Sequence, residues 1–298
     1  MSERFDKVVG LMAALRAPNG CPWDRKQTHE SLKPYLLEET YEVLETIDRG
    51  DEATLREELG DVLLQVLFHS QIAAEAGTFA IDDVLDTLAE KLIRRHPHVF
   101  ATGDRAGSAT NSEQVLSQWE QIKRAERQAR GSIQSALDGV PKTLPALLRA
   151  YQLQARAARV GFDWPHNARG LEQILEKVEE EIRELKQAIA AADTEPGHDQ
   201  SKEQAAIEAE VGDLLFSLVN LARFLKVNPE EALRQATNRF TDRFHLVEAQ
   251  AATQGRRLTD MTLAEMDVLW EEAKRRLAVS GADQAASART VSEENPFG

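Results

Sequence analysis

Apolar residues recur along this chain every three or four positions, which is the spacing of α-helices with one apolar face. Two runs show the spacing most clearly: Leu59, Val62, Leu63, Val66 and Leu67; and Val211, Leu214, Leu215, Leu218, Leu221, Ala222 and Leu225. We expect each run to be buried along that face. The pattern predicts further helices over 4–16, 30–48, 82–95, 111–128, 143–159, 168–192, 229–253 and 262–277.

Glycine and proline fall between these helices, at positions that include Gly50, Gly77, Pro97 and Pro229. Aromatic residues make up only 6% of the chain and runs of β-branched residues are few, so strands are not expected. The fold class is therefore predicted to be all-α. Residues 278–298 are small and polar, and we expect a disordered tail there.

The chain is an internal duplication. Four blocks recur in the same order: Gly20–Trp23 with Gly161–Trp164, Glu38–Glu42 with Glu180–Glu184, Glu58–Asp61 with Glu210–Asp213, and Trp119–Arg124 with Trp270–Arg275. The offset grows between the second and third blocks, and we attribute this to a polar loop inserted over Ala191–Ala205. We predict an N-terminal repeat over 1–130, a linker over 131–147 and a C-terminal repeat over 148–277.

Charge and composition narrow the class of protein. The 298 residues include 36 Lys and Arg against 50 Asp and Glu, a net charge of −14, which argues against a surface that coats nucleic acid. With 42% hydrophobic residues and no apolar run of about 18, the sequence predicts a globular protein without a membrane span. The polar N-terminus and the single cysteine, Cys21, indicate a cytoplasmic location.

Each repeat carries a Glu-Glu-x-x-Glu block followed by Glu-x-x-Asp. The acidic positions are Glu180, Glu181, Glu184, Glu210 and Asp213 in the C-terminal repeat, and Glu38, Glu39, Glu42, Glu58 and Asp61 in the N-terminal repeat. Residues three apart share a helix face, so two facing helices would bring four carboxylates together. The negative charges of four neighbouring carboxylates repel one another unless a cation is present, and their hard oxygen ligands suit Mg²⁺ or Mn²⁺. One acidic pair alone is usually solvated surface, but this constellation occurs twice, which favours a metal site.

Cations and one aromatic residue complete a candidate phosphate site. Arg239 and Arg243 are four residues apart on one predicted helix, and Lys91 and Arg95 take the matching place in the N-terminal repeat. Guanidinium groups bind phosphate through a planar fork. Trp270, one turn before Lys274, either stacks on a base or belongs to the core; the spacing alone fits both roles.

The sequence blocks resemble the MazG family. The resemblance rests on Gly20-Cys21-Pro22-Trp23-Asp24, Gln27-Thr28-His29-Glu30-Ser31-Leu32, Glu38-Glu39-x-x-Glu42, Glu58-Leu59-Gly60-Asp61, Arg95-His96-Pro97-His98-Val99-Phe100 and Trp119-Glu120-Gln121-Ile122-Lys123. It covers residues 1–277 in order. It implies two tandem all-α bundles, related to the all-α dUTPases, that form homodimers.

The resemblance also implies an activity, the Mg²⁺-dependent hydrolysis of nucleoside triphosphates, including ATP, to nucleoside monophosphate and pyrophosphate. The implied cellular role is housekeeping of the nucleotide pool. The resemblance implies that the C-terminal repeat is the catalytic one, with the metal ligands Glu181, Glu184, Glu210 and Asp213. The N-terminal repeat has the equivalent set Glu39, Glu42, Glu58 and Asp61, and the sequence leaves open whether that set is active. The implied nucleotide-binding residues are Lys177, Arg239, Arg243, Trp270 and Lys274. Glu180 is then the candidate for orienting the attacking water. A different class of function, a metal- and nucleotide-binding regulatory module acting on a partner protein, fits the same carboxylates.

Overall fold

The structure is a computed structural model that describes residues 3–100, 111, 114–115, 118–119, 122, 125–126, 135–193 and 200–293. All regular secondary structure in these ranges is helical, which confirms the predicted all-α class. The chain divides into two compact units, Met1–Ser132 and Ile133–Gly298. Most of the helix predicted over 111–128, and the last residues of the predicted tail, lie outside the described residues.

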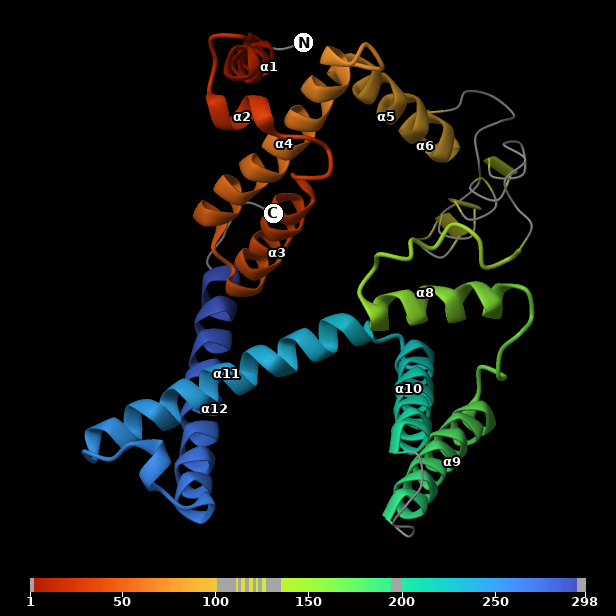
Figure 1. Cartoon of the computed structure of the whole chain (residues 1–298), viewed down its shortest axis with the longest axis vertical. Coiled ribbons are helices and arrows are strands. Elements are labelled where there is room, and N and C mark those ends of the chain that lie inside the picture. Colours follow the sequence, from red (N-terminus) through yellow and green to blue (C-terminus); the bar gives the residue numbers. More distant parts are fainter. Residues whose placement is uncertain are drawn as a thin grey trace. The chain divides into compact units, whose positions relative to one another are not determined.

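The N-terminal unit contains six described helices: α1 (Glu3–Arg16), α2 (Pro22–Lys26), α3 (Lys33–Arg49), α4 (Glu52–Glu75), α5 (Ile81–Arg95) and α6 (Pro97–Phe100). Helices α3 and α4 lie side by side as a hairpin (Figure 1). Gly50, in the left-handed conformation, ends α3. Asp51 then caps α4, because its Oδ1 accepts hydrogen bonds from the backbone N–H groups of Ala53 and Thr54. This tight turn fixes how the two helices face each other.

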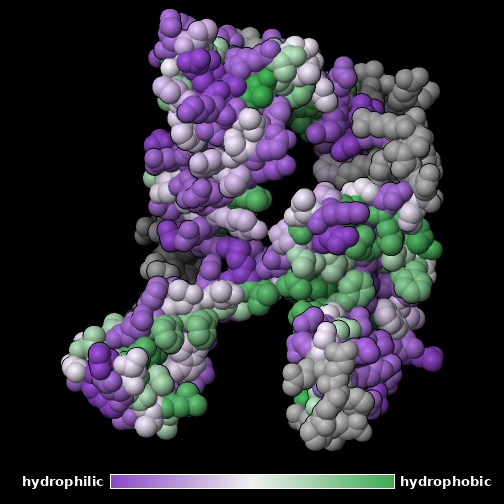
Figure 2. Space-filling view, in the orientation of Figure 1, coloured by the Kyte–Doolittle hydropathy of each residue, from purple (hydrophilic) through white to green (hydrophobic). Residues whose placement is uncertain are grey.

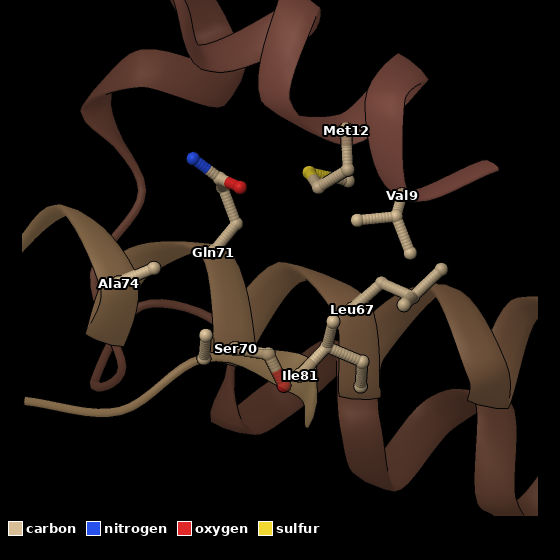
Figure 3. Close-up of a pocket in the computed structure, with 8 residues that line it drawn as sticks. Val9, Met12, Leu67, Ser70, Gln71, Ala74 and Ile81 are labelled. Carbon is tan, nitrogen blue, oxygen red and sulfur yellow. The ribbon is translucent and has the colours of Figure 1, made fainter. Parts of the chain in front are cut away.

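The core of the N-terminal unit joins α1, α4 and the start of α5. Its buried residues are Met12, Leu32, Leu67, Phe68 and Ile81. A cavity of about 90 Å³ remains beside it, where Val9 and Met12 of α1 face Leu67 of α4 (Figure 3). The lining is mainly apolar, and it carries none of the predicted site residues.

The C-terminal unit repeats this plan with longer helices: α8 (Ala146–Arg159), α9 (Ala168–Asp193), α10 (Gln200–Phe224), α11 (Pro229–Thr253), the 3₁₀ turn η2 (Leu258–Asp260) and α12 (Leu263–Glu293). Helices α9 and α10 form the hairpin that corresponds to α3 and α4 (Figure 1). Asn228 caps α11 through its side chain. A second core, formed by Val247, Ala251, Leu269 and Ala273, joins α11 to α12.

Two segments are more helical than the sequence suggested. The loop expected over Ala191–Ala205 is helical at both ends, because α9 continues to Asp193 and α10 begins at Gln200. Helix α12 continues to Glu293, through most of the tail that we expected to be disordered. Both segments contain several alanines, which have the highest intrinsic helix propensity. No helix in the described ranges has the length and apolar character needed to cross a membrane.

The predicted apolar faces are not buried as expected within one chain. Leu59 is 52% exposed and Leu63 is 42% exposed, whereas their neighbours Leu67 and Phe68 are buried. Figure 2 shows hydrophobic residues, in green, at the surface between hydrophilic ones. The periodicity located the apolar stripes correctly, but each unit has too few helices to cover their whole length. Leu215 on α10 is exposed in the same way, at 47%.

Candidate functional site

Three carboxylates of the C-terminal repeat converge between α9 and α10. Glu181 and Glu184 come from α9 and Glu210 from α10, and one oxygen of each lies within 4.8 Å of the other two. Glu181 is buried, with 5% of its surface exposed, and the other two are half-buried. Asp213 lies one turn further along α10 and is exposed, outside this group. Its role as a fourth ligand stays a prediction.

Lys177 is in direct contact with this cluster. Its ammonium Nζ lies 2.8 Å from Oε1 of Glu181 and 3.1 Å from Oε1 of Glu180. The hydrogen bond that Lys177 donates to Glu181, followed by the one it donates to Glu180, raises the pKa of Lys177. The lysine therefore stays charged near neutral pH. The i, i+4 spacing of Lys177 and Glu181 could have indicated this pair from the sequence.

The N-terminal repeat brings together a different trio. Glu39 of α3 meets Glu58 and Asp61 of α4, with oxygens again within 4.8 Å of one another, and Glu42 lies outside the trio. Burial, followed by the negative charge of Asp61, raises the pKa of Glu39. The buried amide of Gln65 forms a hydrogen bond with Glu39 and partly offsets that rise. Gln65, one turn after Asp61 on α4, is a site residue that we did not predict.

Both trios fit a small divalent cation. Mg²⁺ binds oxygen at about 2.1 Å, so opposite ligands of one ion are about 4.2 Å apart. The carboxylate oxygens of each trio therefore need to move only slightly to share one ion. Carboxylates are the hard ligands that Mg²⁺ and Mn²⁺ prefer. The donor set fits the predicted metal, and Glu181, Glu184 and Glu210 would hold it in the C-terminal repeat.

Burial and the crowding of charge act together on the pKa of Glu210. Burial, followed by the charges of Glu184 and Asp213, raises its pKa above the usual value for a glutamate. The folded state therefore holds the Glu210 proton more tightly than the unfolded state. The resulting penalty is absent below the unfolded pKa of about 4.3 and grows as the pH rises through the folded pKa.

We therefore expect Glu210→Gln to raise the thermal unfolding midpoint of the C-terminal unit at pH 7 in EDTA, because it removes one of the mutually repelling charges. The gain should vanish below about pH 4, where Glu210 is neutral in both states. Glu208→Gln is the control, because Glu208 is an exposed carboxylate on the same helix. An equal gain in the control, or a gain that persists at low pH, would contradict the crowding.

The predicted nucleotide-binding residues form a second group, on α11 and α12. The Arg243 guanidinium carbon lies 5.8 Å from the centre of the Trp270 ring, and Phe240 packs against the same ring at 5.2 Å. Trp270 is half-buried and also packs against the core of α11 and α12, so both roles considered for it remain available. Within the described residues, Arg239 is exposed without an ion pair and Lys274 pairs with Glu271. No hydrogen bond, ion pair or ring contact between described residues joins this group to the carboxylates of α9 and α10.

The corresponding cations of the N-terminal repeat are differently placed. Helix α5 ends at Arg95, before Pro97, as the sequence predicted. Arg95 forms an ion pair at 2.5 Å with Glu126, whose pKa falls to about 2 because of the hydrogen bond from Arg95 and a second from Arg94. Its guanidinium is thus already engaged by a carboxylate. Lys91 is left as the other predicted cation of this repeat.

An ion pair that we did not predict connects the start of α9 to α10. Asp163 precedes α9, and its carboxylate accepts hydrogen bonds of 2.5 and 2.9 Å from Arg223 of α10. Both side chains are largely buried, at 12% and 9% exposed. Burial alone would raise the pKa of Asp163, but the hydrogen bond and charge of Arg223 lower it. The pair fixes the entry to α9 against the helix that carries Glu210.

Comparison with known proteins identifies the family. The MazG nucleotide pyrophosphohydrolase domain matches the chain twice, over residues 27–100 and 169–247. These segments contain both carboxylate trios, whereas Trp270 and Lys274 lie beyond the second segment. The duplication found in the sequence is thus a duplication of this domain.

Relatives match over almost the whole chain. The nucleoside triphosphate pyrophosphohydrolase/pyrophosphatase MazG of Thermotoga maritima is 48% identical over 91% of this chain and 95% of its own. The nucleoside triphosphate pyrophosphohydrolase of Escherichia coli K12 is 44% identical over 92% of this chain and 98% of its own. A solved structure, the mazG-related protein from Thermotoga maritima, is 26% identical and covers 41% of this chain and 99% of its own, with a TM-score of 0.34. The chain therefore belongs to the MazG family of nucleotide pyrophosphohydrolases.

Proposed function

We propose that this chain hydrolyses nucleoside triphosphates to nucleoside monophosphate and pyrophosphate, with Mg²⁺ or Mn²⁺ held in the C-terminal repeat. The convergence of Glu181, Glu184 and Glu210 within a segment that matches the family carries the proposal. The names of the relatives support the same reaction. The N-terminal repeat keeps its carboxylates, but its arginine is engaged by Glu126, which favours the C-terminal repeat as the catalytic one.

The mechanism follows from the roles of the side chains. A divalent ion, when bound, supplies positive charge to the α-phosphoryl group and the leaving pyrophosphate. Lys177, Arg239 and Arg243 would bind the phosphates, and Trp270 would stack on the base. Glu180, half-buried beside Lys177, would orient a water molecule and take its proton. The water oxygen bonds to the α-phosphorus while the bond from phosphorus to the α,β-bridging oxygen breaks, and pyrophosphate leaves.

The test is product analysis of the purified full-length chain with a panel of nucleoside triphosphates, in Mg²⁺ and in EDTA. Monophosphate and pyrophosphate in equal amounts, formed only with the metal, are the expected result. Diphosphate and phosphate as products would overturn the proposed site of attack. Tight nucleotide binding without turnover would favour the regulatory module instead.

We further propose that the protein works as a homodimer. Val211, Leu215 and Leu218 form an exposed apolar stripe on α10, with 40%, 47% and 42% of their surfaces exposed. Stripes of this kind on a folded unit mark interaction sites. A second copy is the occupant that we favour, because α10 in each copy offers the same face and two-fold dimers pair identical surfaces.

We expect the wild-type protein to have the mass of a dimer in light scattering at micromolar concentration, and Leu215→Lys with Leu218→Lys to shift it to the monomer. Two lysines in a paired apolar face would be buried without partners, which disfavours association. Leu263→Lys is the control, because Leu263 is 81% exposed at the start of α12, a different helix from the one that carries the stripe. A monomeric wild type, or a double variant that remains dimeric, would contradict the proposed interface.

A further inference from the structure

The two carboxylate trios differ in what compensates their charge. In the C-terminal repeat the ammonium of Lys177 lies 2.8 Å from Glu181, whose side chain is only 6% exposed. The same ammonium also contacts Glu180 at 3.1 Å. A cation is thus already bound to the most buried member of the trio. A divalent ion that uses Glu181 has to compete with this lysine.

The N-terminal repeat has no such lysine. The alignment that matches Glu181 with Glu39 places Tyr35 at the position of Lys177. The ring of Tyr35 packs edge-on against Trp23, at 5.7 Å between centroids. Glu39 instead forms a hydrogen bond with the neutral side-chain amide of Gln65.

No cation replaces the missing lysine within the described part of the N-terminal unit. There, no Lys or Arg forms an ion pair with Glu39, Glu58 or Asp61. The three carboxylates, whose oxygens lie within 4.8 Å of one another, therefore repel one another without a compensating positive charge. In the C-terminal trio one of the three negative charges is balanced by Lys177. Coulomb attraction for a divalent ion is stronger at the uncompensated trio.

We propose that Lys177 acts as a resident cation and makes the two metal sites unequal. The N-terminal trio binds a divalent ion without nucleotide. The C-terminal trio binds one tightly only when a triphosphate draws Lys177 away from Glu181. The inference rests on the proposed function, which places a metal at the C-terminal trio and phosphates at Lys177. Metal and triphosphate then each favour the binding of the other at the C-terminal site. Lys177 therefore competes with the metal for Glu181 when nucleotide is absent, and binds the phosphates when nucleotide is present.

The inference predicts two classes of metal site. The test is the binding of Mn²⁺ to the nucleotide-free, full-length protein, measured by calorimetry and by the electron spin resonance signal of free Mn²⁺. We expect one tight site, abolished by Glu58→Ala and kept in Glu210→Ala. Lys177→Met should tighten the second, weaker site by about tenfold or more, the effect of removing a charged hydrogen bond. Tyr35→Lys should weaken the tight site, because a lysine there reaches Glu39 as Lys177 reaches Glu181.

Lys186→Met is the matched control, since Lys186 is an exposed lysine on α9, and it should leave both sites unchanged. Adding a triphosphate whose α,β-bridging oxygen is replaced by methylene should tighten the second site in the wild type and have less effect in Lys177→Met. Two equal sites in the wild type, unaffected by Lys177→Met, would overturn the inference and leave the proposed hydrolysis standing. Failure of Mn²⁺ to bind either repeat, even with the analogue, would instead remove the metal from the proposed function. Melting curves of each variant show whether it is folded.

Discussion

Glu181→Ala combined with Glu184→Ala is expected to abolish most pyrophosphate release, and Glu39→Ala combined with Glu42→Ala to leave most of it. The first pair removes two of the three carboxylates that converge between α9 and α10. A bound metal ion contributes several kcal/mol to stabilising the transition state. Because each 1.36 kcal/mol is tenfold in rate, the loss should be at least about 100-fold.

The expected difference between the repeats depends on their cations rather than on their carboxylates. Lys177 has no counterpart in the N-terminal repeat, where Tyr35 stands in its place. Arg95 is paired with Glu126, whereas Arg243 lies against the ring of Trp270. The N-terminal repeat therefore offers fewer free positive charges to a triphosphate, even though it can hold a metal ion.

Steady-state pyrophosphate release from the two double variants measures this difference. Glu176→Ala with Glu179→Ala is the matched control, because these two glutamates have the same i, i+3 spacing on α9, are exposed and lie outside the trio. Full activity in the control, with a folded protein by circular dichroism, shows that the loss is specific to the trio. If the Glu39 and Glu42 variant is the inactive one, the roles of the two repeats are reversed.

Much of the fold was predictable because helices have a strong local signature. The helix predicted over 229–253 is observed as Pro229–Thr253, with proline at its first turn and a capping asparagine before it. The end of α5 before Pro97 followed from the steric restriction that proline places on the preceding residue. Such signals act within a few residues, so one sequence is enough to read them.

The tertiary packing of the helices could not be predicted in the same way. Periodicity placed Leu63 and Leu67 on one stripe, but only the packing of α1 and α5 decides that Leu67 is buried and Leu63 is not. Likewise, spacing put Glu210 and Asp213 on one face of α10. The packing of α10 against α9 decides that Glu210, and not Asp213, comes within 4.8 Å of the carboxylate oxygens of Glu181 and Glu184.

The largest loss of stability is expected from Arg223→Met, which leaves the largely buried carboxylate of Asp163 without its arginine partner. Removing one member of a buried ion pair costs about 3–5 kcal/mol, because the remaining charge has lost its compensation. We expect about 3 kcal/mol, the lower end, since Asp163 keeps 12% of its side chain exposed. Asn220, which also accepts a hydrogen bond from Arg223 at 2.7 Å, loses its donor as well.

Urea unfolding of the full-length chain, followed through the transition of the C-terminal unit, measures the loss. Arg257→Met is the control, since Arg257 pairs with Asp260 at 2.9 Å but is 82% exposed. Exposed pairs contribute only about 0–1 kcal/mol. The double variant Arg223→Met with Asp163→Leu should recover most of the loss, because an apolar pair leaves no buried charge.

The pH dependence separates an ion pair from simple packing. The pKa of Asp163 is lowered in the folded state, so the pair stabilises the protein above the unfolded pKa of about 3.9 and loses this effect as the pH falls through the lower, folded value. The difference between wild type and Arg223→Met should therefore be full at pH 7 and shrink below about pH 4. A loss no larger than that of Arg257→Met, or one that does not change with pH, would show that the Asp163 pair does not hold the start of α9 against α10.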